Sequence, residues 1–338
     1  MTAMSELEPH QQFSPILELI RQTKTRVENM VNHELIDLYW HIGAYLNKKI
    51  EQNGWGKSTV ELLADWLVVQ DPDLKGFSRQ NLWRMRQFTE FYTRDQIVTP
   101  MVRELSWTQH LIIISKCRTP EERQFYLTTS RKQRWTKREL ERQINGALFE
   151  RTFENPIQAA KSLETTHPNA VQTFRDTYML EFLGLATPHS ENDLQSALVA
   201  NLKQFLLELG IGFTFVGENY RVQVGLQDFY IDLLFYHRGL QALVAIELKI
   251  DDFKPAHMGQ LEFYLEALDR DHRQPHEAPS IGMLLCKNAD AEVVEYALAR
   301  STSPALVAKY LTQLPNKALL QAKLEEFYAL TQHTKELS

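Results

Sequence analysis

Three charged residues stand inside the two most apolar runs of the sequence. Asp232 lies in the run 228–237, and Glu247 and Lys249 lie in the run 242–250. Burial of a bare charge costs several kcal/mol unless the charge is paired or bound to a metal. Alternate residues of a strand face the same side, so Glu247 and Lys249 point together. If the two runs pair as a hairpin, Asp232 lies beside Glu247, and two carboxylates and a lysine converge at one end of a sheet.

Such a cluster is suited to metal-assisted hydrolysis. Carboxylate oxygens are ligands for Mg²⁺, which keeps several waters and readily takes phosphate oxygens. The metal acidifies a bound water, and Lys249 is a candidate to orient the nucleophile or to neutralise charge at the phosphorus. Gln260 and Tyr264 are four residues apart on the next expected helix and therefore share a face. Glu191, at the start of an earlier expected helix, is the candidate for a further carboxylate.

Each of these residues also has a purely structural interpretation. An E-x-K triplet is expected about once by chance in a chain of this length, and Glu247 and Lys249 would then be an exposed ion pair on an edge strand. Asp232 would be a buried, hydrogen-bonded residue. Gln260 and Tyr264 would lie on a solvated helix face, and the glutamate of the earlier helix would be a first-turn residue favoured by the helix dipole. The joint order on helix, strand, strand and helix favours the catalytic interpretation.

The first half of the sequence has a helical pattern. From residue 13 to about 150, apolar residues recur at intervals of three and four, with no alternating run typical of a strand. The expected helices cover residues 58–70, 78–92, 105–116 and 120–151. Between 152 and 190 the pattern loosens and prolines recur, which indicates a domain boundary near 155–170.

The second half combines short strands with helices. Its expected elements are a helix at 192–209, strand runs at 213–217, 220–224, 228–237 and 242–250, a helix at 256–268, a strand at 280–286, and helices at 289–300 and from about 316. The order α-β-β-β-α-β predicts a mixed sheet covered by helices. The sequence therefore predicts an α+β protein, with an all-α domain at 12–155 followed by a second domain at 170–333.

The order of these elements resembles that of the PD-(D/E)xK nuclease superfamily, whose core is α-β-β-β-α-β. The segments FLLELGIGFTFVG, DFYIDLLFYHRGLQALVAIELK and GQLEFYL closely resemble the YhcG family within it. The helical half, with WHIGAYL, KGFSRQNLWRMRQF and WTKRELERQI, is similar to the N-terminal domain of that family. The resemblance covers almost the whole chain and implies a restriction-endonuclease-like second domain.

The resemblance also implies roles for the clustered residues. The implied ligands of Mg²⁺, for which Mn²⁺ would substitute, are Asp232, Glu247 and the main-chain carbonyl of Leu248. Lys249 is the implied active-site lysine. The residues that correspond to the helix motif of the branch containing RecB-type nucleases are Gln260 and Tyr264.

The sequence departs from the family pattern at two positions. Ile231 stands where the PD signature has a proline, although this position is not a metal ligand. On the first helix of the second domain the family has two acidic positions four residues apart, and here the second is Gln195. Glu191 is therefore the acidic candidate on that helix.

Two basic clusters in the helical half are candidate DNA contacts. The segment 58–92 is a candidate helix-turn-helix in which Arg79, Trp83 and Arg86 share one face of the recognition helix. The second cluster comprises Arg131, Lys132, Arg134, Lys137 and Arg138. Arginines beside an aromatic ring suit phosphate contact and base stacking. A solvated helix face accounts for either cluster equally well. Trp83 is also a candidate for burial against a neighbouring helix or a second copy of the chain. The connection 71–77 is longer than the standard turn of a helix-turn-helix, which counts against that motif.

Charge and cysteine content restrict the remaining classes. The net charge of the 338 residues is −6, but residues 1–155 hold 22 Lys+Arg and 20 Asp+Glu, whereas residues 156–338 hold 15 and 23. Attraction to DNA phosphates is therefore expected mainly from the helical half. Cys117 and Cys286 are too far apart for a CxxC motif, and no run suits a membrane span or a signal peptide. A cytoplasmic protein with no membrane partner is expected.

The leading hypothesis is a Mg²⁺-dependent deoxyribonuclease in DNA repair, recombination, restriction or defence, with DNA as its partner. The alternative is a nuclease-fold DNA-binding or assembly protein that has no turnover and is recruited to a restriction or repair complex. A third interpretation is that the helical domain binds restriction-modification or repair proteins rather than DNA. A second copy of the chain is a further candidate partner.

Overall fold

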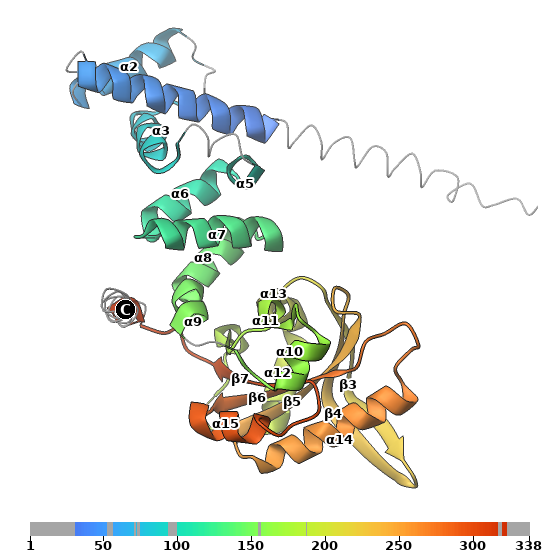
Figure 1. The fold of residues 1–338 in the computed structure, drawn as a ribbon. Coiled ribbons are helices and arrows are strands. Elements are labelled where there is room, and N and C mark those ends of the chain that lie inside the picture. Colours follow the sequence, from blue (N-terminus) through green and yellow to red (C-terminus); the bar gives the residue numbers. More distant parts are fainter. Residues whose placement is uncertain are drawn as a thin grey trace, which may run out of the picture. The chain divides into compact units, whose positions relative to one another are not determined.

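The structure is a computed structural model in which the chain forms two compact units, Met1–Ile144 and Asn145–Ser338 (Figure 1). The residues that it describes are 31–52, 57–70, 72, 75–93, 100–154, 157–186, 188–316 and 320–322. No helix within these residues combines the length and the apolar content needed to cross a membrane.

The first unit is helical throughout its described residues, as the sequence predicts. Residues 31–52 form a helix, followed by α2 (Lys57–Gln70), α3 (Arg79–Phe91), α5 (Pro100–Arg103), α6 (Trp107–Lys116), α7 (Pro120–Gln133) and α8 (Lys137–Asn145). A buried cluster that includes Tyr39, Val60 and Leu82 joins the first helix to α2 and α3. Gly43 permits the close crossing of the first helix and α3, because a Cβ atom there would lie 2.0 Å from the main-chain oxygen of Met85.

The prediction of one helix over 120–151 is wrong, because the segment forms α7, α8 and α9 (Leu148–Glu154). Arg134 ends α7 in the left-handed conformation at φ 52°, and the amide of Trp135 donates to the carbonyl of Ser130. Ala147, at φ 53°, separates α8 from α9. Both turns place a non-glycine residue in a conformation that usually favours glycine, so the sequence carries no ordinary signal for them.

The second unit is built on a seven-stranded mixed sheet with the order β1-β7-β6-β5-β4-β3, and β2 pairs with β7. Its strands are β1 (Gln158–Ala159), β2 (Thr177–Met179), β3 (Phe213–Val224), β4 (Gln227–His237), β5 (Ala242–Asp252), β6 (Ile281–Asn288) and β7 (Ala305–Leu311). Its helices are α9, α10 (Lys161–Thr166), α11 (Ala170–Thr173), α12 (Glu191–Ala200), α13 (Leu202–Leu209), α14 (Ala256–Asp271) and α15 (Ala291–Leu298), with a 3₁₀ turn at Glu181–Leu183.

Helices cover both faces of this sheet (Figure 1). On one face, Leu194 and Leu198 of α12 and Phe205 of α13 pack in one core with Ile246 and Leu248 of β5. On the other face, α14 and α15 pack in a second core that contains alternate residues of the same strands. The expected α-β-β-β-α-β order is therefore present from α12 to β6, and the prediction of an α+β protein with a mixed sheet is confirmed.

Three details of the second unit differ from the sequence prediction. The helix expected at 192–209 is divided at Asn201 into α12 and α13. The two strand runs expected at 213–224 form the single strand β3, which shifts register between Phe215 and Gly217. The sequence prediction omitted β1, β2 and β7, whose pairing joins segments far apart in the chain. Most of the helix expected from about 316 lies outside the described residues. The described part of that segment includes 320–322, which are helical.

The division between the units falls at Ile144–Asn145, before the segment 155–170 at which the sequence indicates a boundary. Helix α9 belongs to the second unit, because the Arg151 guanidinium donates to the main-chain oxygen of Thr177 in β2 at 2.7 Å. The domain limits 12–155 and 170–333 remain predictions.

Candidate active site

The carboxylates Asp232 and Glu247 flank the point at which β4 and β5 separate. The antiparallel pairing of the two strands runs from His237↔Ala242 to Leu233↔Ile246. Beyond this last pair, β5 continues beside β6, with Glu247 opposite Leu284. The hairpin that was predicted to bring the two carboxylates together is therefore present.

Two hydrogen bonds hold Asp232 in place. Its Oδ2 accepts the main-chain amide of Leu248 at 2.8 Å, and its own main-chain oxygen accepts Nε2 of the buried Gln195 at 2.7 Å. Burial raises the pKa of Asp232, and the hydrogen bond from Leu248 and the charge of Lys249 oppose this effect. Asp232 is thus held through its carboxylate by β5 and through its main-chain oxygen by α12.

Glu247 is 2% exposed and has one oxygen that is paired and one that is not. Oε1 accepts a hydrogen bond from Lys249 Nζ at 3.0 Å. Oε2 is buried and finds no hydrogen-bond partner among the described residues. Burial and then the charge of Asp232 raise the pKa of Glu247 to about 7, although Lys249 lowers it. Negative charge at this position therefore lacks full compensation from the protein.

Lys249 links the carboxylates of β5 and α12. Its Nζ lies 3.0 Å from Glu247 Oε1 and 3.4 Å from Glu191 Oε2. Burial lowers the pKa of Lys249, but the charges of Glu247, Glu191 and Asp232 together outweigh it and raise the pKa. The lysine is accordingly protonated at neutral pH. Glu191 is the first residue of α12, a helix that begins with the capping box of Ser190 and Asp193.

Helix α14 brings Gln260 and Tyr264 to the same site. Gln260 Nε2 donates to Tyr264 Oη at 2.8 Å, which confirms that the two side chains share a face. Burial raises the pKa of the buried Tyr264, the hydrogen bond from Gln260 lowers it, and the charges of Glu247 and Asp232 raise it further. The structure thus brings together all six predicted side chains of the cluster, while their individual roles remain predictions.

Sequence reasoning missed two neighbours of this cluster. In the sequence Gln195 stands out only as a departure from the family pattern, yet its side-chain amide donates to the main-chain oxygen of Asp232. His257 lies on α14, three residues before Gln260, and burial and then the charges of Lys249 and Lys254 lower its pKa. The spacing from Gln260 on a helix was a signal for His257, whereas the partner of Gln195 is a main-chain atom that a sequence does not reveal.

The predicted DNA contacts of the first unit are partly neutralised by acidic neighbours. Arg79 pairs with Asp65 at 2.6 Å, Arg86 with Glu90 at 2.9 Å and Arg131 with Glu104 at 2.5 Å. Trp83 is half-buried, with the Arg86 guanidinium 5.3 Å from its ring. The remaining members of the second cluster are exposed, namely Lys132, Arg134, Lys137 and Arg138. A role in DNA binding remains a prediction for all eight residues.

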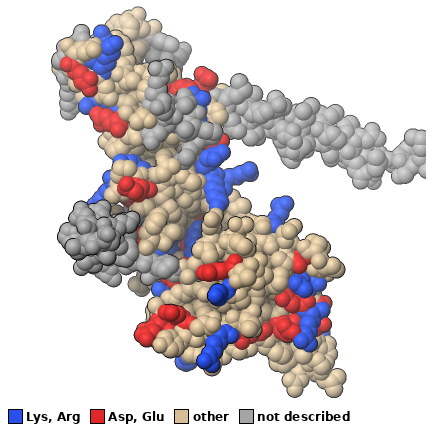
Figure 2. Space-filling model, viewed as in Figure 1, with Lys and Arg blue, Asp and Glu red and all other residues tan. Residues whose placement is uncertain are grey.

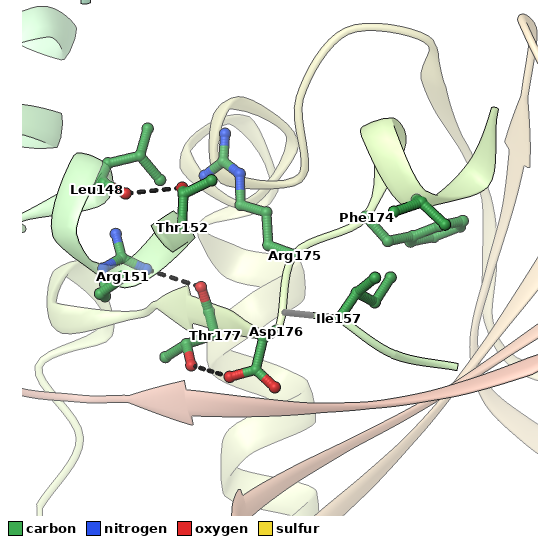
Figure 3. A pocket seen from close by; sticks show the side chains of 9 residues that line it. Leu148, Arg151, Thr152, Ile157, Phe174, Arg175, Asp176 and Thr177 are labelled. Carbon is green, nitrogen blue, oxygen red and sulfur yellow. Dashed lines mark hydrogen bonds between the residues drawn. The ribbon is translucent and has the colours of Figure 1, made fainter. Parts of the chain in front are cut away.

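A separate pocket of about 270 Å³ lies in the second unit between α9, α11 and β2 (Figure 3). Arg151, Arg175 and Asp176 contribute its charged lining. Arg175 pairs with the buried Glu208 at 3.2 Å, and Asp176 pairs with Lys309 at 3.1 Å. These ion pairs serve the packing of the unit, and no residue of the carboxylate cluster lines the pocket.

Comparison with known proteins agrees with the fold. Residues 171–325 match the YhcG PDDEXK nuclease domain, so the second unit contains a nuclease domain of the PD-(D/E)xK class. Residues 15–151 match the DUF1016 N-terminal domain. The Escherichia coli K12 protein named "Putative nuclease YhcG" is 30% identical over 93% of this chain and 94% of its own length. The chain therefore belongs to the YhcG family.

A solved structure is also similar over part of the chain. It is the crystal structure of a repair endonuclease from Pyrococcus abyssi, with 15% identity and a TM-score of 0.26. The similarity covers 39% of this chain and 50% of that chain. The assignment to the YhcG family rests on the sequence matches.

Proposed function

We propose that this chain is a Mg²⁺-dependent nuclease that hydrolyses phosphodiester bonds of DNA, with Mn²⁺ as a substitute metal. The observation that carries the proposal is the buried Glu247, whose Oε2 has no hydrogen-bond partner among the described residues, beside the oriented carboxylate of Asp232. A buried carboxylate without a partner is costly, and bound cations are one of the ways in which proteins compensate it.

The donor set fits a magnesium ion. Among the described residues, no group of three or more His, Cys, Asp or Glu side chains is arranged to hold a metal. Mg²⁺ needs fewer protein ligands than that, because it keeps several waters and is commonly bound through one or two carboxylates together with substrate phosphates. Asp232, Glu247 and the main-chain carbonyl of Leu248 would supply hard oxygen ligands, whereas protein zinc sites are built mainly from thiolate and imidazole ligands.

A bound Mg²⁺ would supply a water of lowered pKa and positive charge beside the phosphate. The chain itself supplies a protonated Lys249, which would stabilise the negative charge that develops on the phosphoryl oxygens. Asp232 is oriented by the hydrogen bond from the Leu248 amide, and Glu191 Oε2 lies 3.4 Å from Lys249 Nζ. Tyr264, which receives the hydrogen bond of Gln260, borders the carboxylates from α14.

The first unit is the proposed source of attraction to DNA. Its exposed Lys132, Arg134, Lys137 and Arg138 would contact phosphates, and the ion pairs of Arg79, Arg86 and Arg131 reduce what those residues contribute. The proposed context is DNA repair, recombination, restriction or defence in the cytoplasm. Restriction-modification or repair proteins and a second copy of the chain are the further proposed partners.

Two measurements on the full chain test this function. Isothermal calorimetry with Mg²⁺ and Mn²⁺ should show binding to the wild type and at least tenfold weaker binding to Asp232→Asn and Glu247→Gln. Cleavage of end-labelled linear, circular and branched DNA should depend on the metal and be lost in both variants. Glu266→Gln is the matched control, since Glu266 is an exposed residue of α14 that pairs with Arg270. Unchanged cleavage in both site variants would refute the assignment.

A further inference from the structure

The hairpin of β3 and β4 extends beyond the rest of the sheet. β4 pairs with β3 from His237 to Gln227, but it pairs with β5 only as far as Leu233. Residues 220–232 therefore form a two-stranded arm, here called the ribbon, that begins at Asp232. Figure 1 shows the ribbon projecting from the sheet beside α14.

Helix α14 braces the base of the ribbon. The rings of Phe229 and Phe263 lie 4.6 Å apart, and Tyr220 Oη and His272 Nδ1 are hydrogen-bonded at 3.1 Å. Val222 is 1% exposed against the same core. Contacts on both strands of the ribbon thus fix its direction relative to the carboxylates.

The end of the ribbon carries no charge and consists of the exposed residues Val224, Gly225, Leu226 and Gln227. Leu226 is 99% exposed, and Val224 and Tyr230 are also exposed. The charges of Arg221 and Asp228 neutralise each other at 2.8 Å. The projecting end carries no blue or red atoms on the face shown in Figure 2. A single exposed leucine is ordinary on a protein surface, but here the leucine stands at the end of a braced arm that starts at Asp232, a proposed metal ligand.

The length of the ribbon can be compared with DNA. Leu226 precedes Asp232 by six residues, which corresponds to roughly 20 Å at about 3.3 Å per strand residue. At about 3.4 Å of rise per base pair, this distance is about six base pairs. Two-stranded ribbons enter either the major or the minor groove, and the apolar side chains that minor-groove binders insert between base steps unstack and kink a duplex.

We propose that Leu226 is a wedge that enters the DNA duplex at a base step about six base pairs from the phosphate held at the carboxylate cluster. The proposal rests on the proposed nuclease function and adds a determinant of substrate form to it. Unstacking costs least where pairing is already disturbed, so the wedge favours mismatched or distorted duplexes. Because Leu226 is uncharged and the nearby Arg221 and Asp228 pair with each other, the contribution of the wedge to this preference is independent of salt.

The test uses the full chain with Asp232→Asn, which removes the proposed cleavage while Leu226 stays in place. Matched and mismatched duplexes carry the fluorescent base 2-aminopurine next to the central step. Binding should raise its fluorescence, and the mismatched duplex should bind more tightly. Leu226→Ser should abolish the rise in fluorescence and lower the preference for the mismatched over the matched duplex about tenfold. The slope of log Kd against log salt should be the same as in the parent. Leu314→Ser, at an exposed position after β7, is the matched control and should behave as the parent.

Each other outcome is decisive. DNA binding without a rise in fluorescence, or an equal rise in Leu226→Ser, overturns the wedge while metal-dependent cleavage by the wild type still supports the nuclease. Loss of a dimer in Leu226→Ser, seen by mass photometry together with unchanged fluorescence, assigns the tip to self-association and overturns the wedge as well. If the wild type neither binds nor cleaves any DNA, both proposals fail. Full exposure of Leu226 ensures that its replacement tests contact rather than folding.

Discussion

Replacement of Glu247 by glutamine should make the metal-free protein more stable at alkaline pH. The side chain is 2% exposed, and burial together with the charge of Asp232 raises its pKa from 4.5 to about 7. Between these two pH values the folded state retains a proton that the unfolded state has released. The free energy of unfolding therefore falls as the pH rises through this interval. Glutamine keeps the shape of the side chain and has no proton to lose.

The size of the effect follows from the pKa. One pKa unit corresponds to about 1.4 kcal/mol, so full ionisation of Glu247 costs the folded state about 3 kcal/mol. Most of this cost develops between pH 5 and pH 8, where the wild type should lose about 2 kcal/mol more than Glu247→Gln. Bound Mg²⁺ should restore stability to the wild type and leave the variant unchanged, since the cation compensates the same charge.

Hydrogen exchange measured by mass spectrometry is the appropriate assay, because peptides from β4 and β5 report on the second unit separately. Every tryptophan of the chain lies at or before residue 135, so tryptophan fluorescence would report on the first unit instead. Exchange is measured in EDTA at pH 5 and pH 8 and corrected for intrinsic exchange rates. It then gives the free energy of unfolding of the second unit at each pH. Peptides from α7 serve as the internal reference, and Glu266→Gln as the matched variant. An equal pH dependence in wild type and Glu247→Gln would refute the view that this carboxylate is uncompensated.

Three further changes test other parts of the structure. Lys249→Met should lower metal-dependent cleavage at least a hundredfold in single-turnover assays, because the ammonium that stabilises the phosphoryl charge is lost. Gln195→Leu should cost the second unit about 1–3 kcal/mol in hydrogen exchange, since the carbonyl of Asp232 loses its donor in a buried place. Gly43→Ala should destabilise the first unit by about 1–3 kcal/mol in urea unfolding followed by tryptophan fluorescence, because the added carbon overlaps the Met85 carbonyl.

The same three changes have clear contrary results. Full cleavage by Lys249→Met would remove the lysine from the mechanism, and calorimetry with Mg²⁺ separates this effect from loss of the metal. Unchanged exchange at β4 in Gln195→Leu would show that the amide does not support Asp232. For the glycine, Gly259→Ala in α14 is the control, because a Cβ atom there meets no atom within 4 Å; its effect is read from hydrogen exchange of α14 peptides, since the tryptophans report on the first unit. An equal effect of the two alanines would exclude close helix crossing as the reason for Gly43.

The candidate site was predictable because its residues break the pattern of their strands. Charges at Asp232, Glu247 and Lys249 in otherwise apolar runs required partners, and strand alternation together with a short connection fixed which residues could meet. Strand alternation could not predict β1 and β2, because these strands have only two and three residues and form by pairing with β7. It also could not find the turn at Arg134, where the following Trp135 is buried and tertiary packing overrides the preference for glycine.

The separation of β4 from β5 connects the fold to the chemistry. Past Leu233↔Ile246 the amide of Leu248 has no main-chain acceptor on β4, and Asp232 Oδ2 takes that place. One carboxylate thus completes the strand pairing and forms half of the proposed metal site. Asparagine keeps an oxygen at this position, whereas alanine would leave a buried amide without an acceptor. For this reason Asp232→Asn isolates the loss of negative charge, and a variant that removes the oxygen would change the end of the sheet, and with it the base of the ribbon, at the same time.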